Sequence, residues 1–251
     1  MRLLLFLLLI ISTFRLYSQP LKYYCHITYD SININGKLTE NAWKNTPWSE
    51  NFVDISGNSN LTPKYNTRMK MMYDNDYLFV GAEISEPHIW ATLRSRDDII
   101  YKDNDFEIFI DPDRDGILYY EIEVNALNTI MDLLMTKPYY QGGKYLLSMD
   151  ISGLKSGIYI EGTLNNPSDL DKKWYVEMAI PFKILCKTLK NRKTPNTGDI
   201  WKINFSRVNW DTKIKNNKYY KLNKPEYNWV WSPIGVIDMH RPDKWGYLIF
   251  K

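Results

Sequence analysis

The sequence contains few of the residues and motifs that usually reveal a disulfide-rich scaffold or an enzyme. Its 251 residues include only 2 cysteines and 3 histidines. Two cysteines do not make a disulfide scaffold, although a Cys25–Cys186 bridge stays open as one alternative because export would permit it. There is no nucleophile elbow, phosphate-binding loop, dinucleotide fingerprint or paired-histidine zinc motif. The commonest sequence signatures of catalysis are therefore missing.

An excess of charge of either sign is missing as well. The chain has 32 lysines and arginines against 29 aspartates and glutamates, a formal net charge of +3. This balance gives no electrostatic argument for nucleic acid or for a membrane surface as a partner. Beyond the first residues, no apolar run approaches the roughly 20 residues that a membrane-spanning helix needs. We expect neither nucleic-acid binding nor membrane insertion.

The one long apolar run lies at the start of the chain. Leu3–Ile11 follows Met1-Arg2 and precedes a small and polar stretch that ends at Gln19. A basic start, a short apolar core and small residues before a cleavage point are typical of a secretory signal peptide. We therefore expect residues 1–19 to be a signal peptide and residues 20–251 to form a single exported domain, located in the periplasm or outside the cell.

Aromatic residues are abundant, with 9 Trp, 19 Tyr and 9 Phe. Side chains of this kind suit an all-β core and also surfaces that stack on sugar rings. Only Pro181–Leu189 predicts a short helix. Clusters of Gly, Pro, Asn and Asp separate runs with strand-like patterns, which are Arg68–Tyr73, Tyr77–Ile84, Phe106–Ile110, Tyr120–Asn125, Thr129–Met135, Gly157–Leu164, Trp174–Ile180, Trp201–Trp210 and Gly246–Phe250. The pattern predicts one antiparallel β-sandwich with little helix.

The most informative of these runs is Phe106–Ile110, because it carries a carboxylate, Glu107, inside an apolar strand. An unpaired buried carboxylate is costly, so it requires a salt bridge, a metal or a polar ligand. The aromatic content of the chain favours a polar ligand, and above all a sugar. Acid pairs for glycoside hydrolysis also stay open, because Asp105, Glu121 and Glu123 lie on or beside neighbouring strands.

An acidic turn follows the same strand. Asp111, Asp113 and Asp115 precede Gly116 in the spacing that opens a calcium-binding loop. An EF-hand would need a glutamate at the twelfth position, which is Ile122 here, so an EF-hand is excluded. Two interpretations remain: a structural calcium site of another kind, or a polar turn that uses Asp and Gly for their backbone preferences. No cofactor is required by either.

Several segments, in order along nearly the whole chain after the signal, resemble the DOMON-like family 9 carbohydrate-binding modules and in particular their stand-alone secreted bacterial relatives. The resemblance is carried by Ile34–Trp43, Lys70–Val80, Glu86–Ala91, Asp103–Asp111, Tyr119–Asn125, Trp174–Pro181, Asn204–Val208, Trp229–Pro233 and His240–Gly246. It implies a jelly-roll or DOMON-like β-sandwich, with one concave sheet face that binds a sugar between two aromatic rings. Some members of this family also carry structural calcium.

By this resemblance, Tyr101 is the first stacking aromatic, Glu107 is the strand glutamate of the binding face and Asn125 is an amide of the neighbouring strand. The chain departs from the family pattern at two places. Met239, beside His240, stands where the second stacking aromatic is expected, and Glu123 stands where the family has an arginine. The ligand-binding set expected from the resemblance therefore also includes these three residues, and Trp90, Trp229 and Trp231 lie near turns where they can line the cleft.

Three functions follow as alternatives. The first is non-catalytic binding of mono- or oligosaccharides or of polysaccharide chain ends, in support of polysaccharide breakdown and of partner glycoside hydrolases. The second is a carbohydrate-active hydrolase or a subunit of one. The third is a haem-binding domain of the wider DOMON group that uses Met239 and His240. Neighbouring residues of a strand point to opposite faces, which argues against both ligating one iron.

Overall fold

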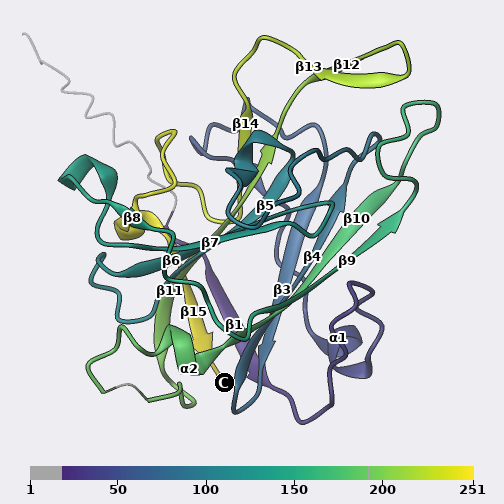
Figure 1. Ribbon diagram of the computed structural model, residues 1–251. Coiled ribbons are helices and arrows are strands. Elements are labelled where there is room, and N and C mark those ends of the chain that lie inside the picture. The colour runs from purple at the N-terminus through teal and green to yellow at the C-terminus, as the bar shows by residue number, and fades with distance from the viewer. Residues whose placement is uncertain (1–18, 192) are drawn as a thin grey trace, which may run out of the picture.

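The computed structural model describes residues 19–191 and 193–251, and the predicted signal segment up to residue 18 lies outside these residues. The described chain folds into two β-sheets that pack face to face (Figure 1). Among the described residues, no helix is long and apolar enough to cross a membrane. The prediction of an almost all-β sandwich is confirmed.

The first sheet contains the strand with the internal carboxylate. Its hydrogen-bonded order is β8 (Tyr145–Leu146), β7 (Ile130–Met135), β6 (Tyr119–Asn125), β5 (Asp105–Asp111), β11 (Ile200–Asn209), β15 (Gly246–Phe250) and β1 (Lys22–Ile27). Two further strands extend it beside β11, namely β14 (Tyr227–Val230) and β2 (Val53–Asp54). This sheet supplies the surface on which the candidate site is built.

The second sheet continues from the same first strand. Its order is β1, β3 (Thr67–Tyr73), β4 (Tyr77–Ser85), β10 (Lys173–Pro181) and β9 (Lys155–Glu161). Strand β1 pairs with β15 through its first residues and with β3 through His26 and Ile27, in parallel on both sides. The sandwich is therefore antiparallel except at β1, which joins the two sheets along one side.

The remaining elements are short. A hairpin of β12 (Thr212–Lys215) and β13 (Lys218–Lys221) projects from the sandwich at the top of Figure 1. The helical turns are α1 (Asn41–Asn45), α2 (Phe182–Leu185), η1 (Ile100–Lys102), η2 (Tyr139–Gln141) and η3 (Pro242–Lys244). The helix predicted over Pro181–Leu189 is present as the single turn α2, which follows Pro181 directly at the end of β10.

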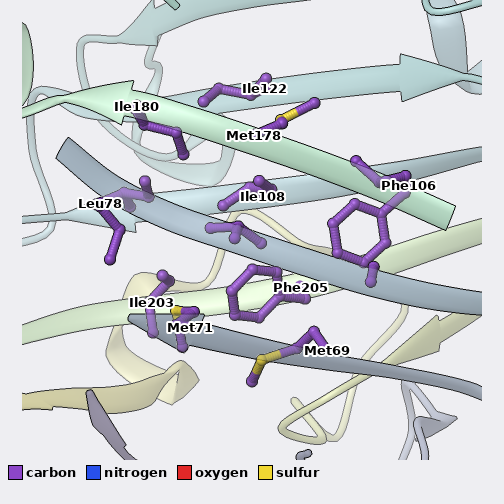
Figure 2. Close-up of a cluster of buried hydrophobic side chains, with 14 of the residues drawn as sticks. Met69, Met71, Leu78, Phe106, Ile108, Ile122, Met178, Ile180, Ile203 and Phe205 are labelled. Atoms are coloured by element: carbon purple, nitrogen blue, oxygen red, sulfur yellow. The ribbon is translucent and has the colours of Figure 1, made fainter. Parts of the chain in front are cut away.

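Alternation along the strands sends one set of side chains into the space between the sheets. From the first sheet these include Phe106, Ile108 and Phe205, and from the second sheet Met71 and Met178, all of them fully buried (Figure 2). Burial of such side chains contributes roughly 1.5–3 kcal/mol each to folding. The strand tryptophans Trp174, Trp201 and Trp229 belong to this core, as does Trp231 directly after β14. Cys25 and Cys186 are both buried free thiols, so the disulfide left open by the sequence is not formed.

The opposite, outer face of the first sheet is also buried, which alternation alone does not require. Phe109, Tyr119, Met131 and Leu133 pack there in a second apolar cluster with Trp245. The turn η1 through Ile100, the loop after β8 through Leu147, and the loop after β14 through Ile234 and Met239 pack on this face. A covered outer face with polar side chains beneath it is a natural place for a binding cavity.

Candidate functional site

The floor of the candidate site is formed by outward-facing residues of β5 and β6. Glu107 lies directly opposite Glu123 across this antiparallel pair, and Phe109 lies opposite Glu121. Since β-strand side chains alternate, these residues share the face away from the central core. Like charges opposite one another destabilise a sheet, so two facing glutamates are an arrangement that folding alone does not favour.

Above this floor lies a cavity of about 470 Å³. Its size falls within the usual range for small-molecule sites. Apolar residues form much of its lining, together with three tyrosines, and its lining residues are Ile55, Ile99, Tyr101, Glu107, Phe109, Glu121, Glu123, Met131, Leu133, Tyr139, Tyr145, Leu147, Val208, Glu226, Asn228, Ile237, Asp238, Met239 and His240. Five of these residues, Tyr101, Glu107, Glu123, Met239 and His240, are ones that the sequence placed in the ligand site.

Tyr101 is held at the rim by its own backbone. Its N–H donates to Glu123 Oε2 at 2.8 Å, and its carbonyl accepts from Trp210 Nε1 at 2.8 Å. These bonds fix the η1 turn against the sheet, while the Tyr101 side chain stays 41% exposed over the cavity. Glu123 therefore positions an aromatic ring and still lines the cavity itself.

His240 lies at the other side of the cavity. Its Nδ1 forms a 2.9 Å hydrogen bond with the Tyr119 hydroxyl, and its Nε2 lies 4.0 Å from Glu121 Oε2. Tyr139 packs edge-on against the imidazole with ring centroids 4.4 Å apart. Burial lowers the pKa of His240 to about 4, so the ring is neutral near pH 7. The histidine thus serves as a neutral, packed wall of the site.

Met239 and His240 occupy a loop rather than a strand, and both line the same cavity. The strand-alternation argument against their sharing one iron is therefore wrong for this pair. The hydrogen bond between the Tyr119 hydroxyl and His240 Nδ1 holds one ring nitrogen in place, and the Met239 carbonyl accepts a bond from Trp245 Nε1 at 2.8 Å. The loop is fixed against the sheet by these contacts.

The carboxyls of the floor have strongly shifted acidities. Burial raises the pKa of Glu107 to about 7 and the pKa of Glu121 to about 8, with repulsion from Glu107 adding to the second. Burial and the charges of Glu107 and Asp105 hold the pKa of Glu123 well above its usual range. No lysine or arginine is among the lining residues of this cavity. The floor therefore offers protonated or weakly compensated carboxyls, which can donate to and accept from ligand hydroxyls.

Two of the residues expected in the ligand site are not among the residues that line the cavity. Asn125 is fully buried, and its amide donates to Leu93 O and Asp103 Oδ2, while its oxygen accepts from two backbone N–H groups. It fastens the segment around Leu93 to β6. Trp90 is buried beside a separate cavity near the β12–β13 hairpin.

The acidic turn after β5 brings Asp111, Asp113 and Asp115 together, with one carboxylate oxygen of each within 4.8 Å of the others. The oxygens of Asp111 accept from the backbone N–H groups of Arg114 and Gly116, as in a polar turn. One buried oxygen of Asp113 has no hydrogen-bond partner. The donor set suits a hard cation such as calcium, and the turn bonds suit the simpler interpretation as well.

Tyr139, Tyr145, Glu226 and Asp238 also line the cavity, and the sequence analysis did not identify them. Tyr139 and Tyr145 are about half exposed, at 47% and 53%. Both lie in or near short loops, where no strand pattern indicates which way a side chain points. Their only sequence signal is a group of tyrosines between two strands.

Comparison with known proteins agrees with this architecture. The family model described as "Carbohydrate family 9 binding domain-like" matches residues 34–248. Among curated proteins, none matches this chain.

Solved structures share the fold. A family 9 carbohydrate-binding module from Caldicellulosiruptor kristjanssonii in complex with cellotriose has a TM-score of 0.58 and 19% identity, over 91% of this chain and 94% of that chain. A glucose complex from the same organism has the same score and identity, over 91% and 96%. A proposed carbohydrate-binding protein from Bacteroides uniformis reaches 0.64 at 17% identity, over 92% and 99%. At such identities the similarity establishes the fold and no more.

Proposed function

Because the chain belongs to the carbohydrate family 9 binding domain-like family, we propose that it binds a sugar without cleaving it, in the cavity on the outer face of β5 and β6. The observation that carries this proposal is the pairing of polar floor and aromatic rim in one cavity. Carboxyls of Glu107 and Glu121 can bond sugar hydroxyls from below. The rings of Tyr101, Tyr139 and Tyr145 can pack on the apolar faces of a pyranose.

The sugar that we propose is neutral and glucose-like. Two solved relatives of the same fold hold cellotriose and glucose. In this chain the cavity lining has carboxyls, no lysine or arginine, and a histidine that is neutral near pH 7, so a sugar carboxylate would meet repulsion with no cation to offset it. A cavity of about 470 Å³ also suits one sugar unit or a chain end better than the middle of a long chain.

Hydrolysis is the second candidate, since Glu107 and Glu123 face one cavity with raised pKa values. Glycosidases place their two carboxyls about 5–5.5 Å apart, or farther, on either side of the scissile bond. One carboxylate oxygen from each of Asp105, Glu107 and Glu123 lies within 4.8 Å of the others, and all three carboxyls lie on one sheet floor rather than on two sides of a bound sugar. This one-sided arrangement favours binding over cleavage. Release of nitrophenol from aryl glycosides by the purified protein would reverse that order.

The setting that we propose for this binding is outside the cytoplasm, in support of polysaccharide breakdown by partner glycoside hydrolases. The support is the signal-like pattern of residues 1–19, which is a feature of sequence alone. A structural calcium ion at Asp111, Asp113 and Asp115 likewise stays a prediction that rests on the donor set.

Calorimetric titration with glucose, cellotriose and glucuronic acid tests the proposal. We expect binding of the neutral sugars and at least tenfold weaker binding of the acid. Loss of one stacking ring in Tyr101→Ala should weaken binding by about tenfold. The matched control is Tyr29→Ala, since Tyr29 is 88% exposed and is not a lining residue of the cavity. Equal affinity in wild type and Tyr101→Ala would place the sugar elsewhere.

A further inference from the structure

Three groups of acidic side chains in the described part of the chain bring carboxylate oxygens within 4.8 Å of one another, and they differ in what neutralises them. In the group of Asp97, Asp132 and Asp150, Arg96 forms ion pairs with two of the three. In the turn after β5, the backbone N–H groups of Arg114 and Gly116 satisfy Asp111. The third group, Asp105, Glu107 and Glu123, is the most deeply buried of the three.

This acidic triad lies on the cavity side of β5 and β6. Asp105 is 0% exposed and is two residues before Glu107 on the same strand, so both point to the same face. Asp105 Oδ1 accepts from Val208 N–H at 3.0 Å, but Asp105 Oδ2 is buried with no hydrogen-bond partner. A buried, unpaired carboxylate oxygen beside two more carboxylates is expensive unless something positive lies between them.

None of the salt bridges in the described part of the chain supplies that positive group. No described lysine, arginine or histidine forms a salt bridge with any member of the acidic triad. Arg207, on the adjacent strand β11, is committed to Glu86, Thr67 and Ser85 O. The triad is therefore a buried group of three carboxyls that no described cationic side chain pairs with.

We propose that the acidic triad of Asp105, Glu107 and Glu123 binds a divalent cation of the calcium type at the floor of the cavity. Calcium takes carboxylate oxygens at about 2.3–2.6 Å, so two oxygens on opposite sides of the ion are about 4.6–5.2 Å apart. One oxygen from each of the three carboxyls lies within 4.8 Å of the other two, so a single ion can reach all three. Ser206, fully buried and directly opposite Glu107 on β11, brings a hydroxyl to the same place. An all-oxygen donor set selects hard cations over zinc or copper.

The ion would face the cavity, because Glu107 and Glu123 both line it while Asp105 closes the site from beneath. Three carboxylates leave several of the six to eight calcium positions open. Those positions point to where the ligand lies, so the ion would coordinate ligand hydroxyls directly. This last consequence rests on the proposed sugar binding, whereas the ion site does not.

Calorimetric titration of the chelator-treated protein with Ca²⁺ and with Mn²⁺, in the absence of sugar, tests the ion site. Wild type should bind at least one ion. Asp105→Asn should lose that binding event, or weaken it at least tenfold, and Glu107→Gln should do the same. The matched control is Asp76→Asn, the same change at an exposed residue outside the three acidic groups, which should keep the event.

The outcomes separate cleanly. A binding event that Asp105→Asn or Glu107→Gln removes and Asp76→Asn keeps supports the triad as the site. Absence of binding in wild type at millimolar ion, or retention of every binding event in both triad variants, overturns the assignment. The melting temperature adds a second reading, since Ca²⁺ should raise it less in Asp105→Asn than in wild type.

A cellotriose titration with and without Ca²⁺ keeps this inference apart from the proposed function. Sugar binding in a protein that takes up no ion would overturn the cation site alone. Ion binding at the triad with no response to any sugar would overturn the sugar proposal alone. Both should be present, and Ca²⁺ should tighten cellotriose binding severalfold.

Discussion

Both outer faces of the sandwich bury carboxyl groups, but only the second sheet satisfies its buried carboxylate fully with hydrogen bonds. On the second sheet, Glu177 of β10 accepts hydrogen bonds from Trp43 Nε1 at 2.7 Å and from the backbone N–H groups of Asn35 and Gly36 at 2.8 Å each. On the first sheet, Asp105 has a buried oxygen with no partner. Both residues are 0% exposed, so burial does not distinguish them.

The difference lies in the donors that surround each group. Glu177 is a structural residue because both of its carboxylate oxygens accept hydrogen bonds from the protein. These bonds connect the segment before α1, and Trp43 in α1, to β10. The acidic triad differs because one buried oxygen of Asp105 has no hydrogen-bond donor in the described chain. Buried polar groups in folded proteins are normally paired, so an unpaired group on a cavity floor points to a ligand. The number of hydrogen-bond donors around a buried carboxyl therefore distinguishes the structural Glu177 from Asp105 in the candidate site, whereas burial does not.

The largest change in stability that we expect comes from removing Glu177, the carboxylate whose hydrogen bonds are satisfied. Glu177→Ala removes the acceptor of three donors at once and should lower the free energy of unfolding by about 3 kcal/mol or more, because buried unsatisfied donors cost about 1–3 kcal/mol each. Urea denaturation measures this. The control is Glu83→Ala on the same sheet, where ion pairs with the half-exposed Arg68 and Lys173 should be worth at most about 1 kcal/mol. Equal losses in the two variants would contradict the role assigned to Glu177.

A smaller change in stability, of opposite sign, should follow from substituting Asp105, which has an oxygen without a hydrogen-bond partner. Asp105→Asn keeps an oxygen for the Val208 N–H and replaces the unpaired carboxyl oxygen by an amide that can donate to Glu107 or Glu123. In chelator, the free energy of unfolding should therefore rise by about 1–2 kcal/mol, since an unsatisfied buried polar atom is removed. A loss of stability comparable to that of Glu177→Ala would mean that the carboxylate of Asp105 is structural.

The β-sandwich could be predicted from the sequence because the alternation of apolar and polar residues along a strand is a local property. Phe106, Ile108 and Ile110 repeat every second residue and predict a strand whichever residues surround it. Strand β1 was not predicted, because Lys22–Ile27 buries only Tyr23 and Cys25, and its parallel pairing with β15 depends on residues more than 200 positions away. The two-residue strands depend on their neighbours in the same way.

The candidate site was accessible only in part, for a related reason. Glu107 could be identified because a charge interrupts a strand pattern, and the family resemblance supplied Tyr101 and Met239. Tyr139 and Tyr145 reach the cavity from the single turn η2 and the two-residue strand β8, which are too short to show a periodicity. Asn125 illustrates the converse, since its place on β6 predicts a polar group but not the internal bonds that occupy it.

The raised pKa of Glu121, on the floor of the candidate site, predicts how the stability of the protein depends on pH. The pKa of Glu121 is about 8 in the folded protein, above the ordinary value of about 4.3 in the unfolded chain. Between these values the folded state binds more protons, so the free energy of unfolding falls as pH rises from about 4.5 to 8. Glu121→Gln removes this contribution and should flatten the decline by at most about 1.4 kcal/mol per pH unit. Urea denaturation at pH 5, 6, 7 and 8 measures the slope, and identical slopes in both proteins would contradict the folded-state pKa.

His240 acts in the other direction and must be separated from this effect. Its pKa is about 4 when folded, below the ordinary value of about 6.5, so its contribution to stability is lost as pH falls from about 6.5 toward 4. Stability should therefore decline on both sides of a maximum in mildly acidic solution. His240→Gln should remove the acid-side decline and leave the alkaline side unchanged.

The smallest effect on stability should come from the rim of the site. The Tyr101 ring is 41% exposed and its anchoring bonds come from the backbone, so Tyr101→Ala keeps the bonds to Glu123 and Trp210. The free energy of unfolding should change by less than about 0.5 kcal/mol, as for other surface substitutions. Urea denaturation of the same preparation that is titrated with cellotriose makes the comparison direct. A variant that loses sugar affinity and keeps its stability separates binding from folding at this residue, whereas a joint loss would mean that the ring holds the η1 turn in place.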